Sequence, residues 1–81
     1  MQLVIHLFAA ARDRAGSPTV VLDLPAAPTV ADIRAALLAR VSELAGLLAV
    51  SRIAVNHDFA EDTDIIPFGA EVAVIPPVSG G

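Results

Sequence analysis

The sequence predicts an α+β domain: a mixed sheet with elements in the order ββαββ and one main helix packed on one face. Segments in which β-branched and apolar residues alternate occur near both ends of the chain. One segment with helical spacing lies between them. The chain has 81 residues, of which 56% are hydrophobic, so nearly all of it must contribute to one small core.

Two strands are expected first, over residues 2–9 and 19–24. Successive side chains of a strand point to opposite faces. In the first strand the odd-numbered residues should therefore face the core, and His6 and Phe8 the other side. In the second strand the even-numbered residues should point inward. Residues 10–18 are interpreted as a connecting loop, which makes the two strands a hairpin.

A helix is expected over about residues 30–41. Thr29 stands at its N-cap, and Asp32 lies near the positive end of the helix dipole. Arg34 falls on the side away from the apolar residues. Residues 43–48 fit either another helical turn or a loop. The apolar residues that recur at helical spacing are Val30, Ile33, Leu37, Leu38 and Val41.

The final strands are expected at residues 51–56 and 71–75. Between them come turn residues, a short edge segment with Phe59, and the acidic loop 61–64. The last strand should turn Ile75 outward. A right-handed crossover through the helix then gives the β-grasp, or ubiquitin-like, fold, with the last strand beside the first in the middle of the sheet.

The composition excludes several classes of function. The net charge is −4 and the chain has no lysine, which argues against nucleic acid as a partner. Without cysteine the chain has no disulfide and no thiolate nucleophile or ligand. Apolar runs are too short to span a bilayer, and no signal peptide is apparent, so a cytoplasmic protein without a membrane partner is expected.

The side chains offer little chemistry. Neither His6 nor His57 has a neighbouring residue in the sequence that would make it a catalyst. His6 is therefore expected to be a surface or interface residue, and His57 a turn residue. The acidic residues of loop 61–64 lack the ligand spacing of a calcium loop, so a solvated loop is the better interpretation and no metal site is expected. The connection at Gly16 has a single glycine and is not a phosphate cradle.

The last six residues differ from the rest. Pro76 and Pro77 have a fixed φ and no backbone donor, so residues 76–81 should form an extended tail beyond a domain of residues 1–75. Gly80 and Gly81 lack a Cβ, so this backbone fits a narrow channel. Six residues reach at most about 20 Å and present the Gly81 carboxylate. A frayed end is the plain alternative, but Gly-Gly behind Pro-Pro favours function.

The outward face of the sheet is expected to be too apolar for water alone. It indicates a partner protein, with Phe8 as an aromatic anchor, although tolerated surface apolarity is an alternative. Arg12, just past the first strand, either adds a charge at the rim or is a solvated loop residue. The apolar residues assigned to this face are Val4, Phe8, Val21, Ala54 and Ile75, with Phe59 nearby.

These segments resemble the small subunit of molybdopterin synthase, a ubiquitin-like sulfur carrier of the MoaD/ThiS family. The resemblance covers the full length and rests on residues 7–13 (LFAAARD), 54–56 (AVN) and 71–81 (EVAVIPPVSGG). The Pro-Pro-Val-Ser-Gly-Gly ending is its most specific part. Ile75 stands where the family often has an aromatic residue, and Asp13 where glutamate is frequent.

The resemblance implies a mechanism in which this chain donates sulfur and is not an enzyme on its own. An E1-like adenylyltransferase would use ATP to adenylate Gly81, and sulfur would then give a thiocarboxylate there. The tail would enter the large subunit, which supplies the catalytic side chains, and donate sulfur to cyclic pyranopterin phosphate. Two carriers and two large subunits would form a heterotetramer. The residues implied in partner binding, with Gly80 beside the reacting Gly81, are Phe8, Arg12, Phe59, Ile75, Pro76, Pro77, Val78 and Ser79.

Three alternatives stay open at this point. The first is a sulfur carrier for thiamine or for tRNA thiolation, which uses the same tail with another acceptor. It also fits a ubiquitin-like protein modifier joined through Gly81, although without lysine it builds no lysine-linked polymers on itself. The third is an interaction module with an inert tail.

Overall fold

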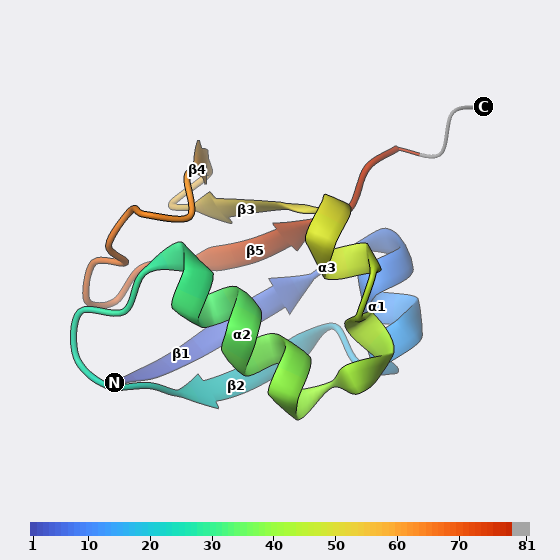
Figure 1. The fold of residues 1–81 in the computed structure, drawn as a ribbon, viewed down its shortest axis with the longest axis horizontal. Helices are drawn as coiled ribbons and strands as arrows, with labels where there is room; N and C mark the ends of the chain where they lie inside the picture. Colours follow the sequence, from blue (N-terminus) through green and yellow to red (C-terminus); the bar gives the residue numbers. More distant parts are fainter. Residues whose placement is uncertain (79–81) are drawn as a thin grey trace.

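A five-stranded mixed sheet forms the centre of the protein, in a computed structural model that describes residues 1–78 (Figure 1). The strand order is β2-β1-β5-β3-β4, and the β1–β5 pair is parallel while the other pairs are antiparallel. This confirms the predicted β-grasp fold. The strands are β1 (Gln2–Leu7), β2 (Thr19–Asp23), β3 (Arg52–Val55), β4 (Asp58–Ala60) and β5 (Val72–Ile75).

The last strand lies beside the first, as predicted. Ile5 is the register partner of Val72, and Leu7 is the partner of Val74. Because β1 and β5 run in the same direction, both end at one end of the sheet. Residues 76–78 leave the sheet there, at the end where the helix that follows β1 is found (Figure 1).

The segment after β1 was expected to be a loop, and this prediction is wrong. Residues Ala9–Ala15 form a seven-residue helix, α1, that ends at Gly16 with a φ of 72°. Four of its residues are alanine, the strongest helix former, and Ala11 is buried. The Gly16 N–H donates to the Arg12 carbonyl and closes the helix. The strands β1 and β2 still pair as a hairpin, with α1 inserted between them.

The main helix, α2 (Val30–Arg40), lies across one face of the sheet. Its start is confirmed, since Thr29 and Asp32 form a capping box: the Thr29 hydroxyl accepts from the Asp32 N–H at 3.3 Å, and the Asp32 carboxylate accepts from the Thr29 N–H at 2.8 Å. Leu38 was expected to point inward but is 45% exposed. It follows the fully buried Leu37, and one step along a helix turns a side chain away from the sheet.

The segment that fitted either a helical turn or a loop contains a short 3₁₀ helix, η1 (Ser42–Leu44), and one helical turn, α3 (Leu47–Val50). Gly46 lies between them with a φ of 81°. Leu44 and Leu48 point into the core from these two turns. The segment therefore closes the end of the core that α2 does not reach.

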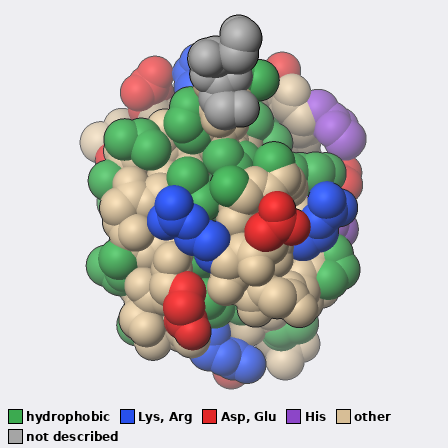
Figure 2. All heavy atoms as spheres, turned by 90° about the vertical axis from the view of Figure 1, so that its right-hand side faces the viewer, with side chains coloured by type: hydrophobic (Ala, Val, Ile, Leu, Met, Phe, Trp, Pro, Cys, Tyr) green, Lys and Arg blue, Asp and Glu red, His purple; other side chains and the backbone are tan. Residues whose placement is uncertain are grey.

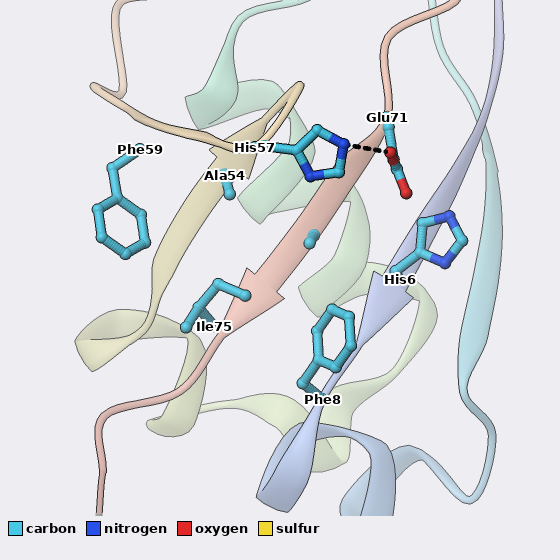
Figure 3. A pocket seen from close by; sticks show the side chains of 8 residues that line it. His6, Phe8, Ala54, His57, Phe59, Glu71 and Ile75 are labelled. Atoms are coloured by element: carbon cyan, nitrogen blue, oxygen red, sulfur yellow. Dashed lines mark ion pairs between the residues drawn. The ribbon is translucent and has the colours of Figure 1, made fainter.

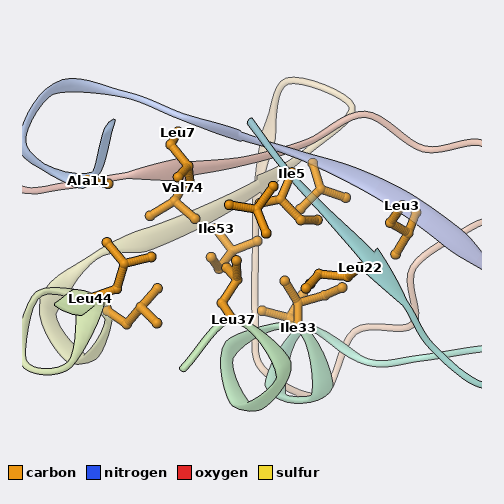
Figure 4. Packing of buried hydrophobic residues seen from close by; sticks show 14 of the residues in the cluster. Leu3, Ile5, Leu7, Ala11, Leu22, Ile33, Leu37, Leu44, Ile53 and Val74 are labelled. Carbon is orange, nitrogen blue, oxygen red and sulfur yellow. The ribbon is translucent and has the colours of Figure 1, made fainter. Parts of the chain in front are cut away.

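The core lies between the sheet and the helices (Figure 4). The alternation predicted for β1, β2 and β5 is confirmed, because the residues assigned inward are the buried ones. Val55, assigned inward on β3, is partly buried. The largest fully buried side chains are Ile5, Leu7, Ile33, Leu37, Leu44, Ile53, Ile66, Val30, Val72 and Val74.

Arg34 of α2 was placed on the solvent side, and this prediction is wrong. Its guanidinium donates to the Asp62 carboxylate at 2.9 Å, to the Ser51 carbonyl at 2.8 Å and to the Leu48 carbonyl. These acceptors lie on α3, at its end, and in the loop after β4. One side chain thus ties together α2 and two segments that are distant from it in sequence.

The acidic loop after β4 packs its backbone against the start of α2. The Asp64 carbonyl accepts from the Val30 N–H, and the Asp62 carbonyl accepts from the Ala31 N–H, both at 3.0 Å. The first N–H groups of a helix have no partner within the helix, so these bonds satisfy them. The acidic side chains stay exposed while their backbone supports the fold. Within residues 1–78 no helix is long and apolar enough to cross a membrane.

Replacing Arg34 with alanine is expected to lower the free energy of unfolding by about 1–3 kcal/mol, because three acceptors lose their donor. Urea denaturation followed by circular dichroism measures this change. Arg40→Ala is the matched control, since Arg40 is exposed and makes one long contact of 3.4 Å to the Val21 carbonyl. It should change stability by less than about 0.5 kcal/mol. Equal losses in the two variants would contradict the role of Arg34.

Candidate functional site

A shallow pocket of about 330 Å³ lies on the outer face of the sheet, opposite α2 (Figure 3). Four strands and the turn after β3 contribute to it. Its lining residues are His6, Phe8, Ala54, His57, Phe59, Glu71, Ala73 and Ile75. The outward assignment of Phe8, Ala54 and Ile75 is thus confirmed, and Phe59 lies with them.

The floor of the pocket is made of small side chains. Ala73 of β5 lies between His6 of β1 and Ala54 of β3 in the register, and Ala54 in turn pairs with Phe59 of β4. Cross-strand neighbours on one face have Cβ atoms about 5 Å apart, so two alanines at the centre leave a hollow between bulkier neighbours. The pattern of small and large residues across four strands therefore creates the pocket.

The two ends of the pocket differ in chemistry (Figure 3). Toward the end where β5 finishes, Phe8, Phe59 and Ile75 form apolar walls, and the two phenylalanines are 49% and 56% exposed. Toward the other end lie His6, His57 and Glu71. Half-exposed aromatic side chains beside a hollow are typical of a surface that binds another protein.

The apolar surface continues beyond the pocket. Val4 of β1 pairs with Val21 of β2, and these two side chains are 46% and 43% exposed. They have the parity of His6 and lie on the same outer face. The predicted apolar face therefore extends from β2 to β4, across the whole width of the sheet.

A two-residue turn carries His57 to the polar end of the pocket. Asn56 and His57 have positive φ values of 51° and 72°, as a tight hairpin turn between β3 and β4 requires. Asn56 is fixed to Glu71 by two bonds: its N–H donates to the Glu71 carbonyl at 2.8 Å, and its side-chain oxygen accepts from the Glu71 N–H at 3.0 Å. This confirms the turn predicted from sequence.

The turn brings two titratable groups together that sequence reasoning did not connect. His57 Nε2 lies 3.1 Å from the Glu71 carboxylate, and both side chains are mostly or half exposed. The two residues are fourteen positions apart, so only the β3–β5 pairing reveals the contact. His57 is therefore a turn residue, as expected, with a polar partner directly before β5.

Arg52 is a second residue that the sequence analysis missed. Its guanidinium carbon lies 3.9 Å from the centre of the Phe59 ring, a cation–π geometry. Arg52 pairs with Ile75 in the register and shares the outward parity of Ala54. The alternation along β3 predicts that Arg52 points outward, but it does not predict that Arg52 contacts Phe59.

The other residues expected to bind a partner lie toward the end where β5 finishes. Arg12 is exposed on α1 and does not line the pocket. Pro76 is partly buried, while Pro77 and Val78 are exposed. Figure 2 shows this end of the molecule, where hydrophobic side chains gather with charged side chains around them. Ser79, Gly80 and Gly81 lie outside the described residues.

The acidic loop has internal partners. The Asp64 carboxylate accepts from the Glu61 N–H at 2.8 Å, and the Asp62 carboxylate binds Arg34. In the part of the chain that the structure describes, no group of three or more His, Cys, Asp or Glu side chains is arranged to hold a metal ion.

Comparison with known proteins decides the family. The sequence profile of the ThiS family matches residues 5–81. The chain belongs to the ThiS family. This confirms the resemblance to ubiquitin-like sulfur carriers of the MoaD/ThiS type, and the match runs through the Gly-Gly ending.

Individual relatives match over their full length or most of it. A protein of Arabidopsis thaliana named molybdopterin synthase sulfur carrier subunit is 30% identical over 81 residues, which is 100% of this chain and 84% of the relative. A protein of Dictyostelium discoideum with the same name is 35% identical, covering 99% of this chain and 96% of the relative. The crystal structure of SAMP1, a small archaeal modifier protein from Haloferax volcanii, superimposes with a TM-score of 0.88 at 30% identity and covers 100% of both chains.

Asn56→Ala is expected to lower the free energy of unfolding by about 1–3 kcal/mol, because alanine loses the bond to the Glu71 N–H and strains at positive φ. Chemical denaturation measures the change. The control is His57→Asn in the same turn, since asparagine tolerates positive φ, and it should stay within about 0.5 kcal/mol of the unmodified protein. An unchanged Asn56→Ala variant would show that this turn is not held by Asn56.

Proposed function

We propose that this protein is the sulfur carrier subunit of a molybdopterin synthase. The observation that carries the proposal is the identity of 30–35% over essentially the whole chain to proteins named molybdopterin synthase sulfur carrier subunit. The apolar outer face supports it, because a subunit needs a surface for its partner. So does the ending Pro-Pro-Val-Ser-Gly-Gly, which matches that family's pattern.

The reacting group in this proposal is the carboxylate of Gly81. An E1-like adenylyltransferase activates it: a carboxylate oxygen attacks the α-phosphorus of ATP, and pyrophosphate leaves. Hydrosulfide, or an equivalent donor of sulfur at the oxidation level of sulfide, then attacks the acyl carbon and displaces AMP, which leaves a thiocarboxylate. A carboxylate is a poor electrophile until it is activated, and glycine has no side chain to hinder attack. The thiocarboxylate sulfur then forms a bond to a carbon of cyclic pyranopterin phosphate as an oxygen substituent leaves that carbon, and water cleaves the acyl–sulfur bond and restores the carboxylate.

The large subunit supplies the catalytic side chains and the docking site. Phe8, Phe59 and Ile75 pack against it, and Arg12 contributes at the rim. Pro76 and Pro77 keep the tail extended and prevent it from pairing as a strand, so residues 76–81 reach up to about 20 Å into the partner. Val78, Ser79 and Gly80 occupy the partner's narrow channel and so deliver Gly81 to its active site. Two carriers and two large subunits assemble as a heterotetramer, and the carrier itself binds no cofactor.

A protein modifier is the second candidate, favoured by the structural match to the small archaeal modifier protein at a TM-score of 0.88. The same activated Gly81 would then be attacked by a lysine amine of a target protein instead of a sulfur nucleophile. Isopeptide-linked species in cells, detected by mass spectrometry, distinguish this function from sulfur transfer. A sulfur carrier for thiamine or tRNA thiolation differs from the first proposal in its acceptor alone.

The untagged protein, incubated with its host's adenylyltransferase, ATP and a sulfur source, is expected to gain the mass of an oxygen-to-sulfur exchange at Gly81. Intact-mass spectrometry followed by fragmentation of the last peptide measures the change. A variant without Gly81 should fold normally and gain no mass, since the core cluster ends at Val74 and none of residues 76–78 belongs to it. No gain in the unmodified protein, with an enzyme that activates a control carrier, would refute the carrier function.

Phe8→Ala is expected to weaken binding of the large subunit about 30-fold, because a central aromatic side chain at an interface contributes about 2 kcal/mol or more. Calorimetric titration measures the dissociation constant. Phe68→Ala is the matched control: Phe68 is 91% exposed, lies in the loop between β4 and β5, and does not line the pocket. The control should bind normally. Equal binding by both variants would refute docking through the pocket.

A further inference from the structure

Arg52 occupies a distinctive place on the outer face. It is the first residue of β3, and its register partner Ile75 directly precedes Pro76. The side chain is exposed and stacks on Phe59 with 3.9 Å between the guanidinium carbon and the ring centre. A cation is therefore held at the apolar end of the pocket, beside the point where the tail begins.

The donors of this guanidinium remain available. Arg34 uses its donors on Asp62, Ser51 and Leu48, and Arg40 donates to a carbonyl of β2. Among residues 1–78 no acceptor within hydrogen-bond distance contacts Arg52. Stacking occupies one face of the guanidinium plane, whereas its five N–H groups point outward in that plane. They are thus free for an acceptor outside this stretch of the chain.

We propose that Arg52 binds a carboxylate of the large synthase subunit and thereby fixes the direction in which that subunit docks. This inference rests on the function proposed above. A planar guanidinium matches a carboxylate with two parallel hydrogen bonds, and the opposite charges strengthen both. Because Phe59 already holds the side chain, less rotational entropy is lost on binding than for a free arginine.

The charges on the rest of the face support a directional role. At the opposite end of the pocket, Glu71 presents a carboxylate next to His57. If the partner docked after a rotation of about 180° about the normal to the sheet, its carboxylate would lie against Glu71. Like charges that meet at an interface are strongly unfavourable. The apolar walls alone would not distinguish these two orientations of the partner. Arg52 and Glu71 together therefore distinguish the productive orientation, in which the tail points into the partner's active site.

Arg52 acts through docking and is a positioning residue. The tail of residues 76–81 extends up to about 20 Å from the sheet, so the acyl carbon of Gly81 reacts far from the guanidinium. The residue should consequently affect the dissociation constant of the complex and its dependence on salt. It should leave the activation of Gly81 by the adenylyltransferase unaffected where that enzyme uses other contacts.

The test is a titration of purified large subunit with four forms of the carrier at low and high salt. We expect Arg52→Gln to bind about tenfold more weakly than the unmodified protein and to lose part of the salt dependence. Arg52→Lys keeps the charge but loses the planar guanidinium, so it should bind more tightly than Arg52→Gln and more weakly than the unmodified protein. Arg40→Gln is the matched control, because it removes the same charge from α2 on the opposite face of the sheet, and it should bind normally.

Each result decides the matter. If the unmodified carrier does not bind the large subunit, the proposed function fails and this inference fails with it. If it binds and Arg52→Gln binds equally well, the inference alone is overturned. It is also overturned if Arg52→Lys is as weak as Arg52→Gln, which would assign the loss to packing on Phe59, or if Arg40→Gln is equally weak, which would assign it to net charge.

Discussion

The parallel pairing of β5 with β1 is the constraint on which the rest of the structure depends. It places a strand from near the end of the chain in the centre of the sheet, with Val72 and Val74 fully buried against the helices. It also sends residues 76–78 out at the end where β1 finishes. Without this pair the sheet would lack its central strand, since β3 joins the sheet through β5.

The same strand serves two purposes through its two faces. Val72 and Val74 close the core, while Ala73 and Ile75, which alternate with them, form the floor and a wall of the outer pocket. The floor of the outer pocket therefore belongs to the same strand that closes the core. Glu71, just before this strand, holds the Asn56 turn through its backbone: its carbonyl accepts from the Asn56 N–H, and its N–H donates to the Asn56 side-chain oxygen.

Patterns of local origin were predictable from the sequence. The alternation along β1, β2 and β5 and the capping box at Thr29 follow from neighbouring residues alone, and they located the core and the outward face. The helix α1 was missed because its arginines are followed by the turn residue Gly16, and the whole segment was therefore interpreted as a loop. The tail was singled out by its prolines and glycines, and its chemistry stays a prediction because Gly80 and Gly81 lie outside the described residues.

Contacts between distant residues were not predictable. Arg34 meets Asp62, and His57 meets Glu71, across intervals of the chain that carry no periodic signal. The stacking of Arg52 on Phe59 likewise needs the register of β3 with β4. In each case the residue type was visible, but its partner followed from the sheet topology.

The β1–β5 pair also has a consequence for how the domain folds. Ile5 meets Val72 with almost the whole chain between them, so the entropy of closing a very long loop must be overcome before the centre of the sheet exists. Such non-local topology slows folding relative to helical domains of equal size. The hairpin β1–β2 and helix α2 can form early, but they bury their apolar faces fully when β5 inserts. Folding is therefore expected to finish with the segment that carries the tail, so that the outer pocket and the exit of the tail are completed in one step.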